Sequence, residues 1–181
     1  MERSARTSMT AAWTSSAKLQ PLFDLVKDQS TWADWSDVQS LELERAGKKD
    51  PNGVGAIRRI RGSNGMEIRE EITEVLEGQR IRYRLLSGLP VTFYEGLTEF
   101  TPASNGGTIV RWTSVFEPES PELMRDLSFF VGRVVRKMVR QVSLAAEVSA
   151  LRHRPIRVPP KPLVAGTQAV AHDLPRYQRL Y

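Results

Sequence analysis

The strongest constraint on the fold is a change of hydrophobic period near residue 120. Between Val38 and Phe116, short runs of alternating apolar and polar residues are separated by turn sequences: KKDPNG, GSNG, EGQ, SGLP and TPASNGG. Such alternation is typical of strands that bury one face. From Pro121 to Leu151 the spacing becomes that of one long amphipathic helix. The pattern predicts strands near 38–46, 55–62, 66–76, 80–87, 91–101 and 107–116, followed by this helix.

The residues before Val38 add three shorter elements. TSMTAAW is expected to form a strand, residues 16–28 have a helical period, and residues 32–35 are expected to form a single helical turn. The short turns between the later strands favour an antiparallel sheet, which needs cover on one face. The 121–151 helix is the only predicted element long enough to supply that cover. Its expected apolar stripe consists of Leu123, Leu127, Phe130, Val131, Val134, Met138, Val142 and Ala145.

Charge is distributed unevenly along the chain. The net charge is +5, but residues 152–181 carry six of the 26 Lys and Arg residues and one of the 21 Asp and Glu residues. The body that precedes them is therefore neutral. A neutral body argues against a general nucleic-acid-binding surface, and no nucleic acid partner is expected.

The C-terminal residues 153–181 have no hydrophobic period and contain five of the eleven prolines. This composition predicts a flexible basic tail that follows a single domain at residues 1–152. Deleting residues 153–181 is expected to change the melting temperature by less than about 3 °C, as measured by circular dichroism. A larger fall would show that Ile156, Leu163 or Tyr177 packs on the domain.

Composition also restricts the chemistry. With no cysteine, the chain forms no disulfide and has no thiolate nucleophile. No apolar run approaches the ~18 residues of a membrane span, and the N-terminal residues lack the apolar core of a secretory signal. We expect a cytoplasmic protein.

Two tryptophans stand in a polar neighbourhood, TWADWSDV. Thr31 and Asp34 match the capping-box pattern, and a single turn would place Trp32 and Trp35 on one face. We interpret this turn as a lid whose inner face closes over one end of the sheet. Plain core packing is the alternative, and it fits Trp35 better than Trp32.

Several segments in succession resemble one known family. WADWSDV, GVGAIRRI, IREEITEV, IRYRLLSGLPVTFYEG and GGTIVRWTSVFEP are similar to the polyketide cyclase/dehydrase-like (SRPBCC) branch of the START and birch-pollen-allergen superfamily, over about residues 10–150. The resemblance implies an α+β helix-grip fold, in which a curved seven-stranded antiparallel sheet wraps around a long C-terminal helix and an internal cavity. It also implies binding of an apolar molecule, with a minority of members being cyclases or dehydratases. The family has no universal catalytic set.

The turns allow the hairpins to be registered, because each turn fixes which residues face each other. One face of each hairpin is then more apolar, and we take it as the inner one. The expected inward pairs are Ile60 with Ile68, Arg58 with Glu70, Ala56 with Ile72, Ile72 with Leu85, Glu74 with Tyr83, Gly96 with Trp112, and Tyr94 with Ser114.

These inward positions predict a ligand-binding site of mostly apolar and aromatic side chains with few polar groups. The alternative is that the same residues fill a solid core, and the family resemblance favours a closed cavity. The predicted ligand-binding residues are Trp32, Trp35, Arg58, Ile60, Glu70, Ile72, Tyr83, Leu85, Tyr94, Phe100, Val110, Trp112, Leu127, Val134 and Met138.

Catalytic motifs are scarce. The two histidines, His153 and His172, lie at the start of the tail or within it, and the sequence has no HExxH motif and no phosphate-binding glycine loop. We predict no metal site and no cofactor. The only candidate acid–base group is Glu70 with Tyr83 or Arg58.

Three functions remain open from the sequence. The leading one is binding or carriage of a small hydrophobic molecule (a lipid, a polyketide or an aromatic compound) by a monomer or homodimer. The second is a cofactor-free cyclase or dehydratase that uses Glu70, Tyr83 and Arg58. The third is a surface-acting interaction protein, in which the basic tail and a basic helix stripe touch a partner or the surface of an anionic membrane, although a solvated helix face explains this stripe more simply. The stripe consists of Arg133, Arg136, Lys137 and Arg140.

Overall fold

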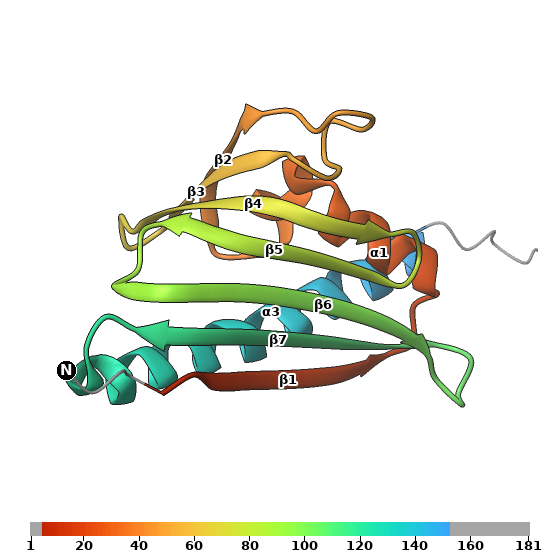
Figure 1. Ribbon diagram of the computed structural model, residues 1–181. Coiled ribbons are helices and arrows are strands. Elements are labelled where there is room, and N and C mark those ends of the chain that lie inside the picture. Colours follow the sequence, from red (N-terminus) through yellow and green to blue (C-terminus); the bar gives the residue numbers. More distant parts are fainter. Residues whose placement is uncertain (1–4, 153–181) are drawn as a thin grey trace, which may run out of the picture.

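The computed structural model describes residues 5–152, which form one antiparallel sheet with helices on one of its faces (Figure 1). The predicted tail at 153–181 lies outside the described residues. The strands are β1 (Thr7–Ser15), β2 (Val38–Arg45), β3 (Ile57–Gly62), β4 (Glu67–Leu76), β5 (Arg80–Ser87), β6 (Val91–Pro102) and β7 (Thr108–Pro118). The helices are α1 (Leu19–Lys27), α2 (Trp32–Trp35) and α3 (Met124–Arg152), with single 3-10 turns at Gln29–Thr31 and Pro121–Leu123.

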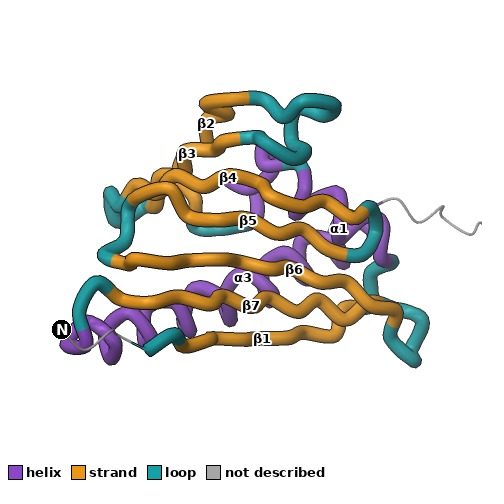
Figure 2. Tube along the Cα trace, viewed as in Figure 1, coloured by secondary structure: helices purple, strands orange, loops and turns teal. Residues whose placement is uncertain are grey.

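The seven strands follow the order β1-β7-β6-β5-β4-β3-β2. Strands β2 to β7 form a meander of neighbouring hairpins, and β1 joins the free edge of β7, where Thr7 lies opposite Phe116 (Figure 2). The predicted α+β helix-grip architecture is confirmed, including the N-terminal strand.

Helix α3 has 29 residues and is therefore about 44 Å long. It packs against β1, β7 and α1, which places it over one side of the sheet rather than its centre. The predicted stripe was wrong at Val134, which is 38% exposed, because the buried line of the helix runs instead through Val131, Val135 and Val139. Because α3 packs on β1 and β7, Val134 lies at the edge of the gap between this helix and the rest of the sheet.

The β3–β4 hairpin has the predicted register. Ile60 lies opposite Ile68, and Arg58 lies opposite Glu70. The pairing of β4 with β5 has two irregularities in register. The first lies between Arg69 and Glu70, and the second lies between Ile72 and Glu74.

This second irregularity corrects one prediction. Glu74 lies opposite Arg82 and forms ion pairs with Arg80 and Arg82 on the outer face, so its expected inward position was wrong. Tyr83 instead lies opposite Ile72, and Leu85 lies opposite Glu70 rather than opposite Ile72 as expected. The extra residue of a β-bulge changes which face the following side chains occupy, and simple alternation does not reveal it.

The β6–β7 register differs from the predicted one by two residues. Gly96 lies opposite Ser114, and Thr98 lies opposite Trp112. A shift of two residues keeps each side chain on its face, so the inward set of these strands is unchanged. A side chain at Gly96 would overlap the ring of Tyr83 on the neighbouring strand β5, so Gly96 makes room for Tyr83 rather than for Trp112.

Candidate functional site

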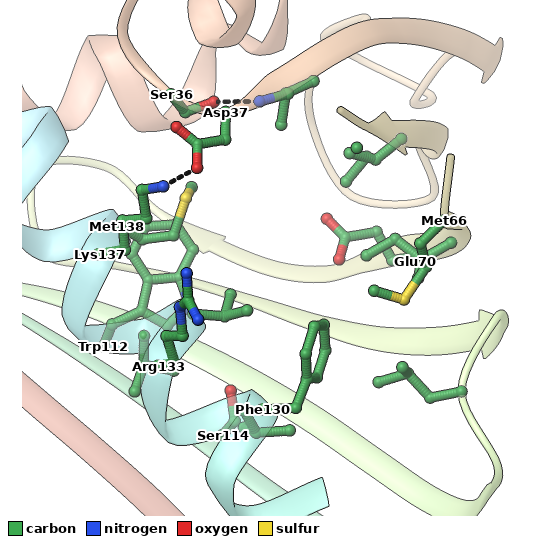
Figure 3. Close-up of a pocket in the computed structure, with 18 of the residues that line it drawn as sticks. Ser36, Asp37, Met66, Glu70, Trp112, Ser114, Phe130, Arg133, Lys137 and Met138 are labelled. Carbon is green, nitrogen blue, oxygen red and sulfur yellow. Dashed lines mark hydrogen bonds and ion pairs between the residues drawn. The ribbon is translucent and has the colours of Figure 1, made fainter. Parts of the chain in front are cut away.

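A pocket of about 460 Å³ lies between the sheet and α3 (Figure 3). It forms because α3 packs on β1 and β7, and therefore does not cover the inner face of β3, β4 and β5. The prediction of a closed cavity was wrong: lining residues Phe129 and Val134 of α3 are 67% and 38% exposed, so the pocket opens to solvent along this helix.

Many of the predicted ligand-binding residues meet at this pocket. They come from α2, from β3 to β7 and from the first half of α3, so the fold gathers side chains that are far apart in the sequence. The predicted residues that border the pocket are Trp32, Ile60, Glu70, Tyr83, Leu85, Tyr94, Trp112, Val134 and Met138.

Six other predicted residues do not border the pocket. Phe100 packs edge-on against Phe23 of α1, with ring centroids 5.4 Å apart, and thus belongs to the core beneath that helix. Ile72, Val110 and Leu127 are likewise buried in the core. The remaining two contact residues that do border the pocket: Trp35 packs against Trp32, and Arg58 pairs with Glu70.

Sequence reasoning missed much of the rim. The alternating pattern already placed Ile68 and Ser114 on inner faces, so these two could have been included. Arg133 and Lys137 were assigned to a solvated stripe, and the loop residues carry no periodic signal. The bordering residues that were not predicted are Ser36, Asp37, Val38, Gly62, Ser63, Asn64, Met66, Ile68, Leu89, Ser114, Phe129, Phe130, Val131, Arg133, Val135, Lys137 and Gln141.

The α2 turn holds Trp32 in the pocket wall. Trp32 is buried, its indole N–H donates to the carbonyl oxygen of Val26 at 3.1 Å, and its ring lies 6.1 Å from that of Trp112. Trp35 packs on the outer side of Trp32, with ring centroids 5.7 Å apart. Trp32 thus is buried and also borders the pocket, whereas Trp35 only packs against Trp32.

The expected capping box is absent, because the Thr31 side chain makes no cap hydrogen bond. The Thr31 hydroxyl instead donates to the carbonyl oxygen of Asp28 at 2.9 Å and accepts the indole N–H of Trp35 at 3.0 Å. Thr31 thus fixes the second tryptophan rather than the start of the helix.

A buried ion pair forms part of the inner wall. Arg58 and Glu70 are 2% and 3% exposed, and the Arg58 Nε donates to the Glu70 Oε1. The guanidinium lies 4.4 Å from the ring centroid of Trp32, an additional cation–π contact. Glu70 borders the pocket, and Figure 3 shows its carboxylate directed into it from β4. Burial raises the pKa of Glu70, and the charge and hydrogen bond of Arg58 oppose this rise.

Two tyrosines supply neutral hydroxyl groups next to this pair. The indole N–H of Trp112 donates to the Tyr83 hydroxyl at 2.9 Å, and the Tyr94 hydroxyl donates to the Ser114 Oγ at 2.8 Å. Burial raises the pKa of Tyr94 to about 12 and raises that of Tyr83 well above its ordinary value. Both phenols therefore keep their protons at neutral pH. Tyr83 accepts from Trp112, so its own O–H can donate, with the Tyr94 hydroxyl as one acceptor.

The described residues provide few features for other kinds of chemistry. Among residues 5–152, no group of three or more His, Asp or Glu side chains is placed to hold a metal ion. Within the same range, no helix is long and apolar enough to cross a membrane.

Comparison with known proteins gives a family and a fold. Residues 6–152 match the model of a family described as "Polyketide cyclase / dehydrase and lipid transport". A search of curated proteins gives no match.

Three solved structures are similar to the chain. A point mutant of Thalictrum flavum norcoclaurine synthase with a transition-state analogue has a TM-score of 0.67 at 14% identity, covering 83% of this chain and 99% of that one. The same plant's enzyme with dopamine and hydroxybenzaldehyde has a TM-score of 0.67 at 13% identity, covering 84% and 91%. The protein XoxI from Bacillus cereus has a TM-score of 0.63 at 19% identity, covering 82% and 99%. Identities this low show a common fold only.

Proposed function

The chain belongs to the polyketide cyclase/dehydrase and lipid transport family, and from that premise we propose that it binds a small, largely apolar molecule in the pocket between the sheet and α3. The observation that carries the proposal is the pocket itself, a space of about 460 Å³ with mostly apolar and aromatic walls. Small-molecule sites commonly measure about 300–1,000 Å³ and combine such walls with a few polar groups.

The walls favour a ligand that contains rings. Trp32, Tyr83, Tyr94 and Trp112 all border the pocket, and aromatic side chains pack well against the faces and edges of other rings. Of the lipid, polyketide and aromatic ligands expected from the sequence, a polyketide or other aromatic compound thus fits best.

The polar wall favours a hydroxyl group on the inner end of the ligand. Because Arg58 already compensates the charge of Glu70, a cationic ligand group would leave a net charge buried, which is unfavourable. A neutral hydroxyl can donate to the Glu70 carboxylate without adding charge. It can also accept the O–H of Tyr83.

Blocking the mouth tests the proposal. Val134→Trp places an indole at the exposed border of the pocket and is expected to weaken binding of the fluorescent probe N-phenyl-1-naphthylamine at least about tenfold, since it removes space that the probe needs. The matched control is Leu144→Trp, at another exposed apolar residue of α3 that does not border the pocket. Fluorescence titration measures both affinities. Equal affinity in the two variants, or no binding by the wild-type protein, would contradict the proposal.

A second candidate is acid–base catalysis on the bound molecule. It is favoured by one observation: Glu70 is buried at the pocket wall with a raised pKa, close to the neutral hydroxyl groups of Tyr83 and Tyr94. Such a set can move a proton to and from a substrate, as a cofactor-free cyclisation or dehydration requires. Mass spectrometry of the molecule that co-purifies with the protein, before and after incubation, decides between the candidates. A product lighter by one water indicates a dehydratase, and an unchanged ligand indicates a binding protein.

A further inference from the structure

The charged side chains that border the pocket are not all paired. They are Asp37, Glu70, Arg133 and Lys137. Glu70 pairs with Arg58 behind it. Asp37 pairs with Lys137 and accepts a hydrogen bond from the Gln141 side chain at 3.2 Å. Within residues 5–152, Arg133 has neither an ion-pair partner nor a side-chain hydrogen bond, so one positive charge at the rim remains uncompensated.

The lack of a partner for Arg133 contrasts with the outer face of the sheet. There the arginines of β3, β4 and β5 each pair with a glutamate of another strand. The pairs are Arg59 with Glu44, Arg61 with Glu67, Arg69 with Glu44, Arg80 and Arg82 with Glu74, and Arg84 with Glu71. On α3, Arg136 and Arg140 also lack an acidic partner among the described residues, but neither borders the pocket.

Arg133 lies on the wall opposite the buried ion pair. Phe129, Arg133 and Lys137 follow one another at four-residue intervals and thus share one side of α3. Figure 3 shows Arg133 reaching from α3 toward the pocket, whereas Glu70 enters from β4. The pocket therefore has a cation at its open rim, an apolar middle and a carboxylate at its inner wall.

We propose that Arg133 binds the carboxylate of the ligand, so that the ligand is an amphipathic organic acid with its acid group at the rim. This inference rests on the proposed function and specifies the chemical class of the bound molecule. A guanidinium matches a carboxylate with two parallel hydrogen bonds, and no acidic residue of the pocket competes for Arg133. The apolar body then lies against Trp32 and Trp112.

A matched pair of competitors tests the assignment. 2-Naphthoate and 2-naphthamide share one ring system and differ in charge, and each is titrated against bound N-phenyl-1-naphthylamine. The wild-type protein is expected to bind the acid about fivefold to tenfold more tightly than the amide, the range for a charge-assisted hydrogen bond at a partly solvated site. Raising NaCl to about 0.5 M reduces this preference, because salt screens exposed charges.

Two variants locate the effect. Arg133→Gln is expected to remove the preference for the acid, because it lowers the affinity for the acid much more than the affinity for the amide. Arg140→Gln removes an equally unpaired arginine of the same helix away from the pocket and is expected to retain the preference. Retention of the preference in Arg133→Gln, or an equal loss in Arg140→Gln, overturns the assignment while leaving pocket binding intact. A wild-type protein that does not bind N-phenyl-1-naphthylamine overturns the proposed function itself.

Discussion

Arg58→Met is expected to lower the free energy of unfolding by about 3–5 kcal/mol, because it leaves the carboxylate of Glu70 buried without its counter-charge. Urea denaturation followed by tryptophan fluorescence measures the loss. The matched control is Arg61→Met on the same strand, where an exposed ion pair with Glu67 is broken and the expected loss is below about 1 kcal/mol. A similar loss in both variants would show that the Arg58–Glu70 pair is not effectively desolvated.

The paired replacement Arg58→Met with Glu70→Leu is expected to recover most of this stability. Apolar residues of similar volume avoid the desolvation of two charges, so exchanging a whole buried pair is often neutral or stabilising. Ligand selectivity then separates a structural pair from a binding one. The wild-type protein should prefer 6-hydroxy-2-naphthoate over 2-naphthoate, and the double variant should bind both equally, because it lacks the acceptor for the hydroxyl. If the double variant still preferred 6-hydroxy-2-naphthoate, the Arg58–Glu70 pair would have a structural role only.

The stability loss in Arg58→Met should also depend on pH. Burial raises the pKa of Glu70, and removing Arg58 takes away the charge that opposes this rise. A raised pKa in the folded state gives stability that is present at low pH and lost as pH rises through that pKa. The difference between wild type and variant should therefore be larger at pH 8 than at pH 5. A pH-independent difference would indicate that Glu70 is solvated in the variant.

The sequence specified the β3–β4 hairpin better than the β4–β5 hairpin, for a local reason. The GSNG turn is short and contains Gly65 with φ 78°, which fixes one register. In β4, both Val75 and Leu76 are apolar, so either can be taken as the inward residue after Ile72. In the structure Val75 lies opposite Ile81, because the register is irregular between Ile72 and Glu74, and the alternating pattern does not reveal this irregularity.

The open rim of the pocket could not be predicted from the helix period. A period identifies the most apolar line of a helix, but it does not say which strands that line meets. Because α3 lies over β1 and β7, its buried line runs through Val131 and Val135, and the adjacent residues Val134 and Arg133 border the pocket. Two residues of the basic stripe, Arg133 and Lys137, thus become part of the candidate site through tertiary packing.

The second large effect is expected at Gly96, which makes room for the ring of Tyr83. A methyl group there would overlap that ring, whose hydroxyl accepts the indole N–H of Trp112. Gly96→Ala is therefore expected to lower the free energy of unfolding by about 2–4 kcal/mol, combining overpacking with the loss of a buried hydrogen bond. The control Gly132→Ala adds a methyl group at ordinary contact distance from Arg136 and Met9, 3.4 Å from each, and should be neutral or slightly stabilising.

A double-mutant cycle shows whether the effect of Gly96→Ala acts through the Tyr83 ring. Tyr83→Val removes the ring that the new methyl group would strike, so the combined variant should lose at least about 1 kcal/mol less than the sum of the two single losses. Displacement of the Tyr83 ring should also affect binding. The ring borders the pocket, so a ring pushed away from residue 96 is expected to occupy part of the pocket. Gly96→Ala alone should thus weaken binding of N-phenyl-1-naphthylamine, and adding Tyr83→Val should restore it in part. If the two losses of unfolding free energy were strictly additive and Gly96→Ala did not affect binding, strand β6 would have moved to accommodate the methyl group and Tyr83 would have kept its position.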